Sequence, residues 1–201
     1  MTSKKTAQLI GVWILFCAVA FGDTAKMPGP PFEYTRDGLL ERPQHYREWV
    51  YLTSGFDMSY SADRQMDQHT FDNVFVDPEA YRIFLATGTW PDRAVLVIEN
   101  RGAEGKGSIN QSGHYQGVNV MALEVHLKDE ARYPGQWAFF EFDGSGPAKM
   151  IPRSEACYSC HAAHAAVDTT FVQFYPTLLP IAQAKGTLSA EYRRETMAER
   201  K

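Results

Sequence analysis

The sequence predicts an α+β fold in which an antiparallel β-sheet has helices packed at one side. Runs rich in β-branched and aromatic residues, of which residues 93–99 are the clearest, predict short strands. Prolines at the start of two segments predict helices in the first half of the chain. The 201 residues show no internal repeat and no domain boundary, so we expect one domain that ends in a C-terminal C-x-x-C-H segment.

The first predicted element is a helix over residues 43–53. Pro43 suits the first helical turn, and Tyr46, Trp49 and Val50 recur at a spacing that places them on one helix face. Residues 54–68 are polar and lack periodicity, which predicts a loop.

A strand and a helix are expected next. Residues 71–76 alternate well enough for a strand, which Asp77 and Pro78 end. Pro78 also fits the first turn of a helix, which we expect to reach Thr87 and to be closed by Gly88.

The middle of the chain predicts three more strands. Residues 93–99 are typical of a buried strand, and residues 118–128 and 137–142 form two more, joined by a charged turn. Residues 102–113 contain four glycines and no periodicity, which predicts a surface loop. These glycines do not follow the Gly-x-x-x-x-Gly-Lys-Ser/Thr pattern, so a phosphate-binding loop is excluded.

The C-terminal part is expected to be helical. Residues 152–165 contain the C-x-x-C-H motif, and Ser154 is a candidate N-cap for its helix. A short segment over residues 171–176 precedes a helix over residues 177–185. From Leu188 onward the chain is charged and is expected to fray.

The N-terminus has the layout of a secretory signal peptide. Lys4 and Lys5 form a basic start, and the uncharged apolar run of residues 9–21, which contains Cys17, is short for a membrane span. An uncleaved anchor is the alternative. With cleavage near Gly22, we expect a periplasmic protein with no membrane attachment. The expected organisation is a signal peptide over residues 1–22, an N-terminal arm over 23–42, the main domain over 43–187 and a charged tail over 188–201.

Cys157-Tyr158-Ser159-Cys160-His161 is a C-x-x-C-H motif. Its spacing suits one covalent haem c, because two thiols can add to the vinyl groups and the adjacent imidazole can bind the iron. No second Cys/His pair at zinc-finger spacing accompanies it, and an export signal agrees with haem attachment outside the cytoplasm. The alternatives are a redox dithiol and a small disulfide ring beside an incidental histidine.

Composition and charge restrict the class of partner. Hydrophobic residues make up 44% and charged residues 22% of the chain, as in soluble globular proteins. The net charge of −4 gives no reason to expect nucleic acid or an anionic membrane surface as a partner.

The motif and its surroundings resemble those of one family. Small electron-carrying cytochromes c are all-helical with the motif near the start, and four-helix cytochromes c′ lack strands such as residues 93–99. Over roughly residues 43–184 the chain resembles the cytochrome P-460 family and its relative cytochrome c′-beta. The resemblance rests on the haem motif and on Tyr46-Arg47-Glu48-Trp49-Val50, Val74-Phe75-Val76-Asp77-Pro78-Glu79-Ala80-Tyr81, Leu123-Glu124 with Lys128-Asp129, Trp137-Ala138-Phe139, residues 168–171 and Phe174-Tyr175-Pro176. It implies a sheet-rich fold, one covalent haem, proximal ligation by His161 and an open sixth position.

Two positions depart from the pattern of that family. In cytochrome P-460 proper, a lysine on the strand that matches residues 93–99 is cross-linked to the porphyrin edge, and the modified haem oxidises hydroxylamine. Ile98 aligns with this lysine and has no nucleophile, so we expect it to give only apolar contact near the porphyrin. A distal arginine of the family aligns with Asp72. Both departures weaken the hydroxylamine-oxidising interpretation.

Glu124 supports that interpretation. It aligns with the distal carboxylate proposed to handle protons in cytochrome P-460. Alternation along its strand puts Glu124 and His126 on one face, and either they face water or they reach the open side of the haem, where burial would raise the pKa of Glu124. The opposite face carries Met121, Leu123, Val125 and Leu127.

Other candidates carry less weight. Met121 and Met150 are possible sixth ligands, although methionine more often fills a core. The remaining histidines are expected to be surface or packing residues, and several aromatic residues are expected to pack around the porphyrin. These are His45, His69, His114 and His164, and Trp137, Phe171, Phe174 and Tyr175.

Three functions remain open. The first is binding of nitric oxide or another small gaseous or nitrogen-oxide ligand at the open iron site. The second is an enzyme that oxidises hydroxylamine or a nitrogen oxide, with Glu124 as the proton acceptor and a soluble redox partner. The third is an electron-transfer cytochrome, which requires a sixth protein ligand. A homodimer is also possible.

Overall fold

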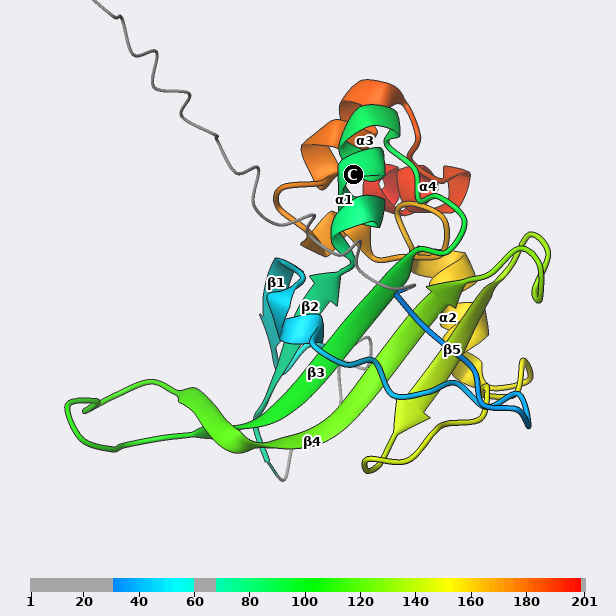
Figure 1. Cartoon of the computed structure of the whole chain (residues 1–201). Coiled ribbons are helices and arrows are strands. Elements are labelled where there is room, and N and C mark those ends of the chain that lie inside the picture. The colour runs from blue at the N-terminus through cyan, green and yellow to red at the C-terminus, as the bar shows by residue number, and fades with distance from the viewer. Residues whose placement is uncertain (1–30, 60–67, 200–201) are drawn as a thin grey trace, which may run out of the picture.

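The computed structural model of the chain describes residues 31–59 and 68–199 (Figure 1). The expected signal peptide, Cys17, the segment 23–30 that starts the N-terminal arm, residues 60–67 of the predicted loop and residues 200–201 of the charged tail lie outside these residues. Among the residues described, no helix is both long and apolar enough to cross a membrane.

One five-stranded antiparallel sheet forms the centre of the described structure. Its strands run in chain order, so each strand pairs with the next. They are β1 (Val50–Phe56), β2 (Thr70–Val76), β3 (Val95–Glu104), β4 (Tyr115–Lys128) and β5 (Trp137–Phe142). The α+β class with an antiparallel sheet is confirmed. The predicted loop over residues 102–113 is shorter than expected, because β3 continues to Glu104, and its hairpin with β4 extends beyond the rest of the sheet (Figure 1).

The predicted helix over residues 43–53 is wrong. Only Tyr46–Glu48 is helical, as one 3-10 turn, and His45 before it is left-handed with φ 56°. Val50 begins β1, where it pairs with Val76. Pairing with the neighbouring strand outweighs the helical spacing, because β-branched and aromatic residues fit a half-buried sheet. For the same reason β1 extends to Phe56, into the segment predicted as a loop.

Helix α1 (Pro78–Thr87) has the predicted bounds. Asp77 caps it by accepting a hydrogen bond from the backbone N–H of Ala80 at 2.8 Å. Its second carboxylate oxygen accepts one from the backbone N–H of Val95 at 3.0 Å, so Asp77 also attaches the helix to β3. Gly88 ends the helix with φ 78°, a conformation that glycine adopts without steric cost.

The C-terminal helices are α2 (Ala156–His164), α3 (Leu179–Lys185) and α4 (Ala190–Glu199), with a 3-10 turn at Val172–Phe174. The Ser154 cap is wrong, because Glu155 is the N-cap residue and its side chain makes no cap hydrogen bond. The expected fraying from Leu188 is also wrong. Ser189 caps α4 by accepting a hydrogen bond from the N–H of Tyr192, and α4 packs against α2.

The two faces of the sheet are covered differently. One face packs against α1, α2 and α3 through a core cluster that includes Phe84, Leu96 and Phe139. The other face packs against the segment before β1, through a cluster that includes Leu40 and Val125. Figure 1 shows that segment in front of the sheet and α2 behind β4 and β5. The first face therefore carries the C-x-x-C-H helix.

Candidate functional site

Helix α2 presents the two cysteines of the motif on one side. Cys157 and Cys160 are three residues apart, which places them on neighbouring turns of the same helix face. Neither forms a disulfide, and both are partly exposed. Burial raises the pKa of each thiol above its ordinary value. A redox dithiol at a helix N-terminus has the opposite shift, so the environment of α2 is not typical of such a dithiol.

His161 is the buried member of the motif, with 9% of its surface exposed. Its Nδ1 lies 2.7 Å from the backbone carbonyl oxygen of Thr169. Because a carbonyl only accepts, Nδ1 carries the proton and donates this bond. Burial lowers the pKa of His161, so the ring is neutral near pH 7. Nε2 is then the nitrogen with a lone pair, which is the tautomer that an iron ligand requires.

Aromatic rings surround the imidazole of His161. The ring centroids of Phe171, His126 and Phe139 lie 4.2, 4.6 and 4.7 Å from that of His161. Burial holds the pKa of His126 well below its ordinary value, so this second histidine is also neutral. Phe139 stacks on Tyr158, whose hydroxyl donates to the carbonyl of Ile151 and accepts from the N–H of Phe139. The walls of the site are therefore aromatic and anchored to β5.

Glu124 and Ile98 lie on the same sheet face as α2. They are direct cross-strand neighbours in the β3–β4 register, and Ile98 and Cys157 both pack against the core cluster on this face. Glu124 is partly buried, and its Oε1 accepts a hydrogen bond from Nδ2 of Asn100 at 2.9 Å. Burial raises the pKa of Glu124, and the charges of Glu141 and Asp72 add to this shift.

Burial raises the pKa of Cys157, and the charges of Glu155 and Glu124 add to this shift. Of the two orientations open for Glu124 and His126, the structure has the pair turned toward α2 rather than into water. His126 is only 6% exposed.

The methionines considered as iron ligands and the remaining histidines lie away from the ring of His161. Met121 is 50% exposed and Met150 packs in the cluster on the opposite sheet face. His164 contacts Glu195 of α4 at 3.1 Å. Two surface hollows, one between Arg42 and Phe142 and one beside His114, include no residue of α2 in their linings.

Sequence reasoning named the motif, Ile98, Glu124 and His126, but it missed two neighbours of His161, namely Phe139 and the carbonyl of Thr169. The alternation of side chains along a strand places Phe139 on the same face as Trp137, and this signal could have indicated it. The carbonyl of Thr169 has no sequence signal, because any residue carries one. Of the expected aromatic neighbours, Phe171 contacts His161, whereas Phe174 contacts Phe171.

This donor set fits a haem that is held by two thioethers and one imidazole. The thiols are not in a disulfide, the imidazole has its proton on the far nitrogen, and the adjacent rings are apolar or neutral. All three properties agree with the binding of a prosthetic group that needs an apolar pocket.

Comparison with known proteins supports the same cofactor. Residues 43–172 match the family model described as Cytochrome P460. The matched region is more than half of the chain and contains the sheet, α2 and Thr169. A comparison with curated proteins finds no match.

Proposed function

Because the chain belongs to the cytochrome P460 family, a family of haem c cytochromes, we propose that it binds nitric oxide or another small ligand at one haem whose iron is held by His161. The observation that carries this proposal is the state of His161. It is buried, neutral and bonded through Nδ1 to Thr169, next to two thiols that are not in a disulfide. Cys157 and Cys160 would hold the haem as thioethers, and Nε2 of His161 would be its axial ligand.

An open sixth position agrees with the side chains on the α2 face of the sheet. The two methionines considered as ligands are either half-exposed or on the opposite sheet face. When bound, the haem iron supplies a coordination position for a diatomic ligand and one-electron redox chemistry. Ile98 contributes an apolar surface and has no amine, which favours an unmodified porphyrin over the cross-linked one of cytochrome P-460.

The second candidate function is oxidation of hydroxylamine or a nitrogen oxide, and the position of Glu124 favours it. This carboxylate is partly buried on the α2 face with a raised pKa, and Asn100 holds one of its oxygens. The other oxygen could accept a proton from a substrate, because a carboxylate with a pKa closer to neutral is a more effective general base. An electron-transfer cytochrome is the third candidate, and it has the least support because it needs a sixth protein ligand.

An optical spectrum of the purified ferrous protein tests the main proposal. We expect high-spin bands of ordinary position that change at once on addition of nitric oxide. The haem should stay with the chain in a denaturing gel and should be lost from the Cys157→Ala/Cys160→Ala double variant. Low-spin bands without added ligand would contradict the open site, and a red-shifted main band would contradict the absence of a cross-link.

We also propose that the chain is exported to the periplasm, with cleavage near Gly22, and that a soluble redox partner serves it if it turns over substrate. The support is the basic start and the apolar run before Gly22, and the place where c-type haem is attached. N-terminal sequencing of protein from a periplasmic extract tests cleavage, and an intact Met1 on membrane-bound protein would contradict it. Light scattering of the same preparation tests a homodimer.

A further inference from the structure

A tight turn after α2 carries the carbonyl group that holds His161. Val167 and Thr170 close it with two backbone hydrogen bonds, Thr170 N–H to Val167 O at 2.7 Å and Val167 N–H to Thr170 O at 3.3 Å. The two central residues, Asp168 and Thr169, both have positive φ, at 52° and 59°. Turns of this kind favour Asn-Gly or Asp-Gly, because both central residues must be left-handed.

Thr169 is an unfavourable residue for its place in the turn. A β-branched side chain is sterically strained at positive φ, and the buried Oγ1 of Thr169 has no hydrogen-bond partner. Both features work against local stability. Strained backbone persists where the surrounding structure fixes it and often occurs at functional sites. The contact that this turn makes is the bond from Nδ1 of His161 to Thr169 O.

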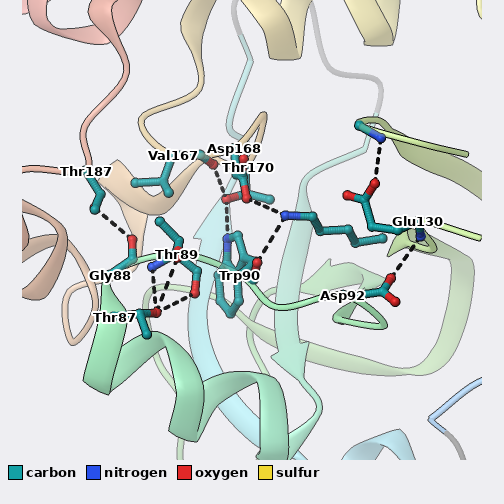
Figure 2. A network of polar contacts seen from close by, with 12 residues as sticks. Thr87, Gly88, Thr89, Trp90, Asp92, Glu130, Val167, Asp168, Thr170 and Thr187 are labelled. Carbon is teal, nitrogen blue, oxygen red and sulfur yellow. Dashed lines mark hydrogen bonds and ion pairs between the residues drawn. The ribbon is translucent and has the colours of Figure 1, made fainter.

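Two residues outside the turn contact a central residue and the last residue of the turn. Figure 2 shows Trp90 beside Thr170, with Asp168 next to it. Nζ of Lys128, at the end of β4, donates to Asp168 Oδ2 at 2.9 Å and to the carbonyl of Trp90 at 3.1 Å. Nε1 of Trp90 donates to Oγ1 of Thr170 at 2.7 Å, and this hydroxyl donates to the carbonyl of Val167. Trp90 and Thr170 are almost completely buried.

We propose that Lys128 and Trp90 are positioning residues for the axial ligand. Through Asp168 and Thr170 they hold the carbonyl of Thr169 on Nδ1 of His161, and so set the orientation and electron donation of the imidazole. This inference rests on the proposed role of His161 as the iron ligand. A hydrogen bond from Nδ1 to a carbonyl raises the basicity of the ligating nitrogen and stabilises the ferric state. Loosening the turn should therefore make the iron easier to reduce.

A purely structural role predicts something different. The Lys128–Asp168 ion pair is partly exposed, and such pairs contribute little to stability. Loss of this pair should hardly change the thermal midpoint. Under a positioning role, it should still change the properties of the iron, because the turn and its carbonyl move with it.

The test compares the haem-loaded full chain with its variants. Lys128→Met keeps the side-chain stem but removes the ammonium group, and Asp168→Asn removes the partner charge with a residue that tolerates positive φ. Arg82→Met is the matched control, because it breaks an exposed ion pair with Glu79 on α1. The readouts are the midpoint potential, the iron–histidine stretching frequency of the ferrous protein and the thermal midpoint.

We expect Lys128→Met and Asp168→Asn each to raise the ratio of reduced to oxidised protein by about tenfold at a fixed applied potential. The stretching frequency should fall in both variants, and the double variant should add little to either single change. Lys128→Arg should restore the original values. Arg82→Met should leave them unchanged, with a thermal midpoint close to those of the other variants.

Two other results would overturn the inference, and they show whether the proposed function fails with it. If the native protein has an iron–histidine band and Lys128→Met moves the potential no further than Arg82→Met, the positioning role is wrong and the proposed function stands. If the native protein lacks that band and His161→Ala leaves the spectrum unchanged, the proposed ligand itself is wrong and the inference fails with it.

Discussion

At the scale of single residues, the environment of each side chain decides its chemistry. Glu124 and Glu99 both lie on the central strands, but on opposite faces. Glu99 contacts Arg101, Arg47 and Tyr46, and these hydrogen bonds and charges lower its pKa despite its burial. Glu124 has only the amide of Asn100 to offset its burial, and its pKa rises. The surroundings of these two carboxyl groups therefore shift their pKa values in opposite directions.

Replacing Glu124 with glutamine should change how stability depends on pH. Below its ordinary pKa of 4.5 the carboxyl is neutral in the folded and the unfolded chain, and its contribution to stability is fully present. As the pH rises above this ordinary pKa, the carboxyl group ionises in the unfolded chain before it does so in the folded chain, and its contribution to stability is lost. The total loss is about 1.4 kcal/mol for each pH unit between the unfolded and the folded pKa. The glutamine of Glu124→Gln cannot ionise. The free energy of unfolding of this variant, relative to that of the native protein, should therefore increase as the pH rises over this range. Urea titrations at several pH values measure the gain.

The exposed neighbour Glu141 provides the control, since Glu141→Gln should not reproduce this gain. In the haem-loaded protein, Glu124→Gln also separates the two leading functions. It should leave nitric oxide affinity nearly intact and lower any hydroxylamine turnover by roughly 10²-fold or more. Robust native turnover that falls in this way would favour the enzyme over the ligand-binding protein.

At the scale of secondary-structure elements, β4 connects the parts of the site. It carries Glu124 across from Ile98, His126 against His161, and Lys128 on the turn whose Thr169 carbonyl accepts a hydrogen bond from His161. These side chains alternate with Leu123, Val125 and Leu127, which fill the core on the opposite face. A shift of one residue in register would exchange the two sets, so the buried leucines fix where the functional side chains point.

Asp77 should be the residue on which the junction of α1 and β3 depends most. Asp77→Ala removes the acceptor for two backbone N–H groups, those of Ala80 and Val95. Loss of the cap together with a buried unpaired N–H should lower the free energy of unfolding by roughly 2–4 kcal/mol. Chemical denaturation measures this loss. Glu79→Ala, on the exposed first turn of the same helix, is the control and should change it by less than about 1 kcal/mol; an equal loss in both variants would contradict the role of Asp77.

The elements also show what the sequence could and could not predict. Residues 137–142 and 78–87 have the predicted bounds, because the strand is rich in aromatic residues and Asp77, Pro78 and Gly88 mark the helix ends. The helix expected over 43–53 is instead one 3-10 turn followed by the start of β1, since pairing with β2 is invisible in a single segment. In the site, Cys157, Cys160 and His161 follow from their spacing, but the turn at Asp168 and Thr169 depends on contacts from Trp90 and Lys128, which are far away in the sequence.

At the scale of the whole molecule, the described structure continues beyond the region shared with the family. The match ends at residue 172, whereas α3 and α4 follow it, and α4 packs against the C-x-x-C-H helix α2. Ser189 donates from Oγ to the carbonyl of Ala165 at 2.7 Å and from its N–H to that of Ala166 at 2.7 Å. These are the residues that lead from α2 into the turn at Asp168. The C-terminal segment therefore supports the helix and turn around His161 from outside.

Removing this segment should weaken the fold without removing the ligand-binding chemistry. Truncation after Leu188 deletes the Ser189 bonds, the Glu195 contact with His164 and the packing of Tyr192 on the core. Loss of these contacts should lower the free energy of unfolding by roughly 2–3 kcal/mol, which corresponds to a fall of several degrees in the thermal midpoint. Nitric oxide binding should persist at low temperature, because every residue proposed to hold the haem lies within 43–172.

The variant Glu195→Gln separates the ion pair from the rest of α4. The contact between His164 and Glu195 is more than one third exposed on both sides, so its loss alone should change stability by less than about 1 kcal/mol. Calorimetry on the two haem-loaded variants compares the effects. A truncated protein with an unchanged midpoint would show that α4 is dispensable for the fold. A truncated protein that is folded but fails to bind nitric oxide would show instead that the binding site requires the end of the chain.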